Sequence, residues 1–203
     1  MKIGILGGTF NPIHYGHLLH AENIRTRKKL DKIIFVPSKN PPHKMDMKIP
    51  SFNIRKTMVE IAIKSNPFFL MSEIESHRLG PSYTVDTLSE LKSMQAEDEF
   101  YLILGADSIL SIETWKDYED ILTSIKVLVI DRYKDRIQDL DKNILKYKKT
   151  YGDNIEKVQA PLIDISSTDI RDRIKKGLSI KYYLPEDVEN YIYENQLYLK
   201  DEN

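Results

Sequence analysis

The sequence contains no cysteine among its 203 residues. A thiol nucleophile, a cysteine-ligated zinc site and a disulfide are therefore excluded. It also lacks an apolar run long enough to cross a membrane, and its first apolar run stops at residue 7, too early for a signal peptide. We expect a cytoplasmic protein with no membrane partner.

An excess of charge of one sign is missing as well. Thirty basic and 31 acidic residues give a formal net charge of −1, so the chain as a whole is not a polycation that would bind nucleic acid. One stretch, residues 25–56, holds ten Lys or Arg against two Asp. Solvated surface charge is its ordinary explanation, and we expect no nucleic-acid partner; a duplex titration across salt concentrations would detect one.

Short apolar runs alternate with longer amphipathic segments along the chain. Runs that are apolar on both faces are typical of parallel strands covered by helices on both sides. The pattern predicts an α/β fold, a doubly wound, Rossmann-like parallel sheet with helices on both faces, forming a single domain over residues 1–203. The expected strands cover residues 3–6, 33–36, 68–71, 100–104, 127–130 and 162–165. The expected helices cover residues 17–30, 51–65, 83–94, 117–122, 134–149, 168–176 and 185–193.

Residues 7–17, GGTFNPIHYGH, directly follow the first expected strand. Two adjacent glycines allow positive φ and a close approach of backbone N–H groups to a ligand. His14 and His17 flank Gly16, so both rings can lie at one helix N-terminus, which favours anions. Ligands of such sheets bind beyond the carboxyl ends of the strands. A metal site of His14, His17 and His20 is the less favoured alternative, and packing is the ordinary role of His20.

A second anion site is predicted where Ser166, Ser167 and Thr168 follow an expected strand. Their hydroxyls can cap a helix whose first N–H groups face a ligand, and Arg171 lies one turn further on. Taken alone, the segment is better explained as an ordinary capped helix with an exposed arginine; the presence of two such helix starts in one chain favours the anion site.

Two other segments could contact a ligand. His43 and Lys44 follow two prolines inside the basic stretch, where an extended loop could meet a phosphate; a stiff surface loop is the alternative. Trp115 is the only tryptophan, and a buried ring is its ordinary role.

The segment GTFNPIHYGH resembles the HxGH signature of a nucleotidyltransferase superfamily whose adenylyltransferases move AMP from ATP. Four later segments are PPHK (41–44), SYTVDTL (82–88), GADS (105–108) with Trp115, and ISSTDIR (165–171). In this order they make the chain, from residue 1 to about residue 199, similar to the bacterial nicotinate-nucleotide adenylyltransferase family of NAD biosynthesis.

The resemblance implies that ATP and nicotinate mononucleotide are the substrates. We expect Mg²⁺ to be carried with ATP and expect no metal site in the protein, because the sequence shows no dedicated cage of carboxylates. The implied catalytic residues are His14, His17, Thr168 and Arg171. The implied ATP-binding residues are Gly8, Thr9, Phe10, Gly16, Gly105, Ile165, Ser166 and Ser167. The implied nicotinate-nucleotide-binding residues are His43, Lys44, Thr84, Asp107 and Trp115.

Position 11 departs from the family, because Asn11 stands where many relatives carry Asp. Either side chain can organise a turn by hydrogen bonds to the backbone. A sibling transferase for nicotinamide mononucleotide or phosphopantetheine, and a non-catalytic nucleotide-binding regulator, are the alternative functions. The sequence leaves homo-oligomer formation open.

Overall fold

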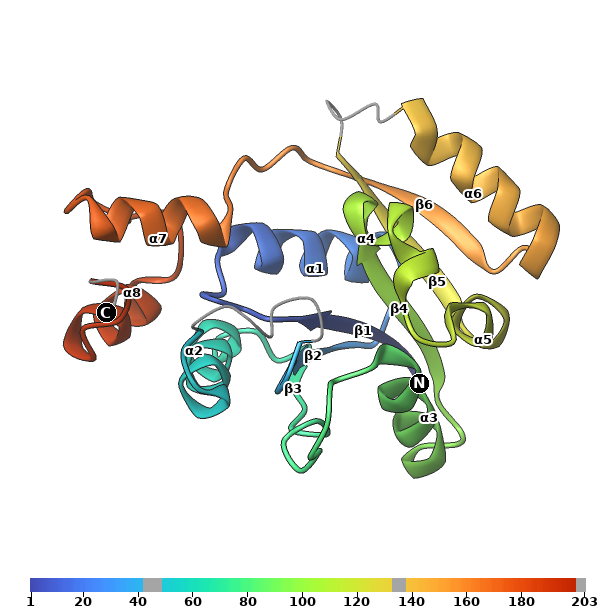
Figure 1. Cartoon of the computed structure of the whole chain (residues 1–203), viewed down its shortest axis with the longest axis horizontal. Helices are drawn as coiled ribbons and strands as arrows, with labels where there is room; N and C mark the ends of the chain where they lie inside the picture. The colour runs from blue at the N-terminus through green and yellow to red at the C-terminus, as the bar shows by residue number, and fades with distance from the viewer. Residues whose placement is uncertain (42–48, 133–137, 200–203) are drawn as a thin grey trace.

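The computed structural model describes residues 1–41, 49–132 and 138–199 (Figure 1). Its strands are all parallel and form one sheet in the order β3-β2-β1-β4-β5-β6. The strands are β1 (Lys2–Gly8), β2 (Lys32–Pro37), β3 (Phe69–Met71), β4 (Glu99–Gly105), β5 (Lys126–Arg132) and β6 (Ile155–Ala160). The helices are α1 (Tyr15–Lys28), α2 (Phe52–Ile63), α3 (Thr84–Met94), α4 (Ala106–Leu110), α5 (Tyr118–Ser124), α6 (Gln138–Tyr151), α7 (Ser167–Lys175) and α8 (Glu186–Glu194).

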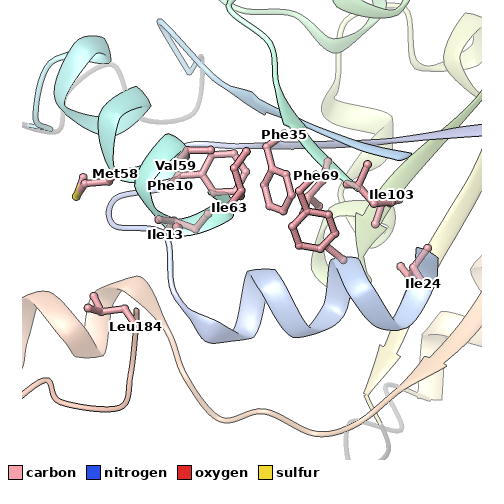
Figure 2. Close-up of a cluster of buried hydrophobic side chains, with 14 of the residues drawn as sticks. Phe10, Ile13, Ile24, Phe35, Met58, Val59, Ile63, Phe69, Ile103 and Leu184 are labelled. Atoms are coloured by element: carbon pink, nitrogen blue, oxygen red, sulfur yellow. The ribbon is translucent and has the colours of Figure 1, made fainter. Parts of the chain in front are cut away.

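Each face of the sheet carries its own apolar core. Helices α1, α2, α7 and α8 contribute to one core, and α3, α4, α5 and α6 contribute to the other. Figure 2 shows Phe35 and Phe69 between the sheet and α1, with their ring centroids 5.1 Å apart. Burial on both faces explains why the central strands are apolar throughout. The expected doubly wound α/β fold with helices on both faces is confirmed.

The strand order reverses at β1. This strand pairs with β2 on one side and with β4 on the other. The chain runs outward from β1 through β2 and β3 and then crosses back to β4. The connections after β1 and β4 therefore leave the sheet in opposite directions, and a crevice opens between the carboxyl ends of these strands.

The expected strand at residues 162–165 is wrong, because the sixth strand is β6, Ile155–Ala160. This strand lies at the edge of the sheet beside β5. It buries Ile155, Val158 and Ala160 and exposes the positions between them, so it lacks the continuous apolar run of a central strand. The apolar run that follows is outside the sheet, and Leu162 is 39% exposed.

Two helix expectations also change. Residues 105–115, which lie between an expected strand and an expected helix, contain α4 and the short 3₁₀ helix η2 (Ile112–Thr114). Helix α1 begins at Tyr15 rather than at His17, because His14 occupies its N-cap position. The start expected for the helix at 134–149 lies outside the described residues. None of the helices in the described parts of the chain combines the length and apolarity needed to cross a membrane.

Candidate active site

A cavity of about 380 Å³ lies at the carboxyl ends of β1 and β4, at the reversal in strand order. Its volume is within the usual range for small-molecule sites. The cavity brings together six of the predicted site residues from separate parts of the chain: Gly8, Thr9, His17, Thr84, Gly105 and Trp115. The structure therefore gathers predicted ATP residues and predicted nicotinate-nucleotide residues around one space.

The expectation of positive φ at the two glycines that end β1 is wrong. Gly7 and Gly8 belong to the strand and do not take positive φ. A side chain on Gly7 would meet nothing within 4 Å, whereas a Cβ on Gly8 would come within 3.1 Å of the Phe10 ring. Because these glycines have no side chains, the backbone at the end of β1 is open to the cavity and the Phe10 ring has room beside Gly8. The left-handed residue of the turn is Phe10 itself, with φ of 48°.

His14 and His17 meet at the start of α1. The backbone N–H of His14 donates to Nδ1 of His17 at 3.2 Å, so the neutral His17 ring carries its proton on Nε2. The two rings lie 3.8 Å apart between centroids. A Cβ on Gly16 would come within 2.9 Å of the His14 ring, so glycine is required there. His14 is buried at 6% exposure, and only His17 of the pair lines the cavity.

The start of α7 lies against the turn between β1 and α1 (Figure 1). The Ser167 hydroxyl donates to the Pro12 carbonyl at 2.8 Å. Ser166 caps the helix, since its Oγ accepts the Asp169 N–H at 3.0 Å. The carbonyl of Ile165 would lie 3.5 Å from a Cβ at position 16. The two predicted anion sites are thus adjacent.

Arg171 ties the same helix to the turn. Its Nη1 donates to the Asn11 carbonyl at 2.8 Å, and its Nη2 donates to Oγ1 of Thr168 at 3.2 Å. Arg171 and Thr168 both stand outside the lining of the cavity. Arg171 therefore contacts the turn from α7 without lining the pocket itself.

The wall opposite the turn comes from α3 and from the residue after η2. Thr84 is the first residue of α3, and the Tyr83 side chain does not cap that helix, so its first N–H groups face outward at a positive helix end. Trp115 follows η2 and lines the cavity. Asp107 is exposed on α4 and does not line it. His43 and Lys44 lie outside the described residues.

Sequence reasoning missed a buried polar network in the cavity wall. Glu75 is 5% exposed and lines the cavity. Its Oε1 accepts from the Thr87 hydroxyl at 2.8 Å, and its Oε2 accepts from the Lys39 N–H at 3.3 Å. Nη1 of Arg78 donates to Oγ1 of Thr87 at 2.7 Å. The hydrogen-bonded pairs stand 9 to 36 positions apart along the chain, and no motif signals them.

Two further side chains near the turn are buried. His20 is 6% exposed, lines the cavity, and has its Nε2 3.3 Å from the Pro161 carbonyl. The Asn11 side chain, expected to bond the backbone, accepts from the Tyr198 hydroxyl at 2.8 Å instead. Burial raises the pKa of Tyr198, so its hydroxyl stays protonated and donates at neutral pH.

Among the described residues, no group of three or more His, Asp or Glu is placed to hold a metal ion.

The cytidylyltransferase-like family model matches residues 5–173. This span runs from β1 into α7 and includes the turn with His17 and the start of α7 with Arg171. The chain therefore belongs to the cytidylyltransferase-like family.

Full-length relatives narrow this assignment. The chain is 46% identical to a probable nicotinate-nucleotide adenylyltransferase of Thermoanaerobacter sp., over 100% of this chain and 96% of the relative. It is 44% identical to that of Dictyoglomus thermophilum, over 98% and 100% of the two chains. The solved Plasmodium falciparum nicotinic acid mononucleotide adenylyltransferase complexed with NaAD shares the fold, with a TM-score of 0.80 over 97% of each chain at 24% identity. Within the cytidylyltransferase-like family, the chain groups with the nicotinate-nucleotide adenylyltransferases.

Proposed function

We propose that the protein transfers AMP from ATP to nicotinate mononucleotide, forming nicotinate adenine dinucleotide and pyrophosphate. The observation that carries the proposal is the cavity between β1 and β4, which joins His17 to the wall of Thr84 and Trp115. A triphosphate and a pyridine nucleotide can meet there. The names of the full-length relatives support the same reaction.

The reaction is an in-line displacement at the α-phosphorus of ATP. A phosphate oxygen of nicotinate mononucleotide forms the new P–O bond, while the bond from the α-phosphorus to the bridging oxygen breaks and pyrophosphate leaves with the electron pair. The attacking phosphate is already an anion at neutral pH, so no general base is needed. Catalysis then rests on positioning and on stabilising the charge of the transition state.

On the ATP side, each protein group has one task in this proposal. Nε2 of His17 donates to an α-phosphate oxygen, since its Nδ1 accepts from the backbone of His14. Thr168 and Arg171 donate to the outer phosphates from the start of α7. Backbone groups of residues 165–167 lie beside the adenine. His14 supports the His17 ring, which it contacts.

The glycines and the remaining turn residues make room for the nucleotide. Gly8 and Gly105 end β1 and β4 at the cavity without side chains, so phosphates and ribose can approach the backbone. Thr9 lines the cavity, while Phe10 supports the turn from the core. Gly16 leaves space for the His14 ring.

On the acceptor side, the pyridine ring stacks on Trp115 in this proposal, and its carboxylate faces the N-terminus of α3 at Thr84. A helix N-terminus favours an anion over a neutral amide, which favours nicotinate over nicotinamide. Asp107, exposed near the cavity mouth, is proposed to bind a ribose hydroxyl. The roles of His43 and Lys44 rest on the family resemblance.

Mg²⁺ enters as part of the substrate, bound to ATP. Mg²⁺ keeps several waters and commonly uses substrate phosphates as ligands, so a nucleotide can bring it to the site without a protein cage. In this proposal, the triphosphate oxygens and water hold the ion.

The test is release of pyrophosphate from ATP and Mg²⁺ with each candidate acceptor in turn. We expect turnover with nicotinate mononucleotide, and much slower turnover with nicotinamide mononucleotide or phosphopantetheine. A reaction without an acceptor measures background hydrolysis of ATP. No release with nicotinate mononucleotide would falsify the proposal.

A further inference from the structure

Phe10 holds a strained backbone conformation in the middle of the turn. Its φ of 48° places a bulky residue in the left-handed region, where a side chain strains the backbone. Its ring is 2% exposed and lies 5.2 Å from the His17 ring, edge to face. Any relaxation of Phe10 would therefore move the histidine that lines the cavity.

The residues on either side of Phe10 each have their backbone carbonyl hydrogen-bonded to an arginine. Nη1 of Arg55 donates to the Thr9 carbonyl at 2.8 Å, and Nη1 of Arg171 donates to the Asn11 carbonyl at 2.8 Å. In a trans peptide the N–H points opposite to the carbonyl. Arg55 thus fixes the direction of the Phe10 N–H as well as that of the Thr9 carbonyl.

Arg55 reaches the turn from α2 and is 1% exposed. Its Nε donates to the Pro50 carbonyl at 3.0 Å, and its Nη2 contacts the Lys39 carbonyl at 3.3 Å. All three of the hydrogen bonds described for this guanidinium go to backbone carbonyls. They join the turn to Lys39, two residues after β2, and to Pro50, two residues before α2.

Burial of the Arg55 guanidinium costs solvation free energy. Burial lowers the pKa of Arg55, and the negative charge of Glu75 opposes the shift. Removing a guanidinium from water costs several kcal/mol, and an apolar side chain of similar length would fill the space without that cost. The benefit of Arg55 therefore lies in the geometry that its planar donor fork imposes.

We propose that Arg55 is a positioning residue for AMP transfer, which acts by holding the Thr9 carbonyl and so keeping Phe10 and the His17 ring in the geometry that the reaction needs. It does not line the cavity and does not touch the substrates. This inference rests on the proposed function, and it adds a residue from α2 to the catalytic apparatus.

The test compares Arg55→Lys with Arg25→Lys in the full chain. Arg25 is the control, because its guanidinium is partly buried and bonded to Glu22 at 2.6 Å, but it does not line the cavity. A lysine at position 55 carries a point charge that cannot reproduce the three-way fork. We expect kcat to fall on the order of 10- to 100-fold, the range for a small misplacement of a catalytic group, while KM for ATP changes much less. Arg25→Lys should keep kcat.

Chemical rescue separates positioning from stability. Arg55→Ala should regain part of its kcat when guanidinium chloride is added at tens of millimolar, and sodium chloride at the same concentration should not restore it. Thermal unfolding of each variant establishes that kcat refers to folded protein.

Several outcomes would overturn the inference. They are an unchanged kcat in Arg55→Lys, a loss that only follows the folded fraction, failure of Arg55→Lys to fold, or absence of guanidinium-specific rescue. If the unsubstituted protein forms no dinucleotide, the proposed function fails. If it turns over and Arg55→Lys equals it, only this inference fails.

Discussion

Substitution of His17 separates the two roles that the structure gives to its ring. Nδ1 accepts the His14 N–H at the start of α1, and Nε2 carries the proton of the neutral ring, which lines the cavity. Losing a donor to developing charge costs on the order of 10²–10³ in kcat, about 2.7–4 kcal/mol. Losing a helix cap costs about 1 kcal/mol of stability, or about 2–4 °C in Tm for a chain of this size.

Three variants distinguish these effects. In His17→Asn, the amide oxygen lies near the place of Nδ1 and can keep the cap, so we expect native stability with the full loss of kcat. In His17→Gln, the amide nitrogen reaches towards the place of Nε2, so we expect part of kcat to remain. His17→Ala should lose both, and His77→Ala, an exposed histidine away from the cavity, is the control.

The assay is steady-state pyrophosphate release at saturating ATP and nicotinate mononucleotide, with thermal unfolding measured on the same samples. His17→Ala turning over like the unsubstituted protein would refute the donor role. A loss of kcat in His17→Asn no larger than that in His17→Gln would refute the assignment of the donor to Nε2.

Three further predictions concern the cavity wall, the core and the C-terminal tyrosine. Trp115→Ala should raise KM for nicotinate mononucleotide on the order of tenfold or more, because aromatic stacking contributes about 1–3 kcal/mol, and Trp115→Phe should retain most of the affinity; equal KM values in steady-state kinetics would contradict stacking. Gly4→Ala should lower stability by about 1–3 kcal/mol with kcat unchanged, since a Cβ there would lie 2.6 Å from Ile33 Cδ1 and 2.8 Å from Ile103 Cδ1. An unchanged Tm would contradict this, because it would show that the two isoleucine side chains move aside without a loss of stability. Burial raises the pKa of Tyr198 above its usual value, so its effect on stability is constant below about pH 10 and is lost as the pH rises further, where the unfolded chain ionises first. Tyr198→Phe should therefore make the alkaline decline in unfolding free energy shallower, and identical urea-unfolding profiles from pH 8 to 11 would contradict this.

The central strands could be predicted because burial on both faces leaves a continuous apolar run, as at residues 33–36 and 127–130. The edge strand β6 could not, since it buries only Ile155, Val158 and Ala160 and is followed by a more apolar run that lies outside the sheet. An apolar run alone therefore does not identify a strand: residues 162–165 lie outside the sheet, and Leu162 among them is 39% exposed.

The residues of the candidate site also differ in whether the sequence alone could predict them. His17 and the start of α7 were predictable because each lies within a contiguous segment whose residue types suit a helix-end anion site. Arg55 and Glu75 were not, because their partners are brought to them only by the fold. The positive φ expected at the glycines falls instead on Phe10: the turn requires a left-handed residue, and tertiary contacts hold an aromatic side chain there.

The central claim is that AMP is transferred at the cavity between β1 and β4. The most direct measurement uses ATP labelled at either its α- or its γ-phosphate, incubated with nicotinate mononucleotide and Mg²⁺. We predict that the α-label appears in the dinucleotide and the γ-label in pyrophosphate, with both signals lost together in His17→Ala. Label from the γ-phosphate in the acceptor product, or α-label that never enters a dinucleotide, would contradict the account.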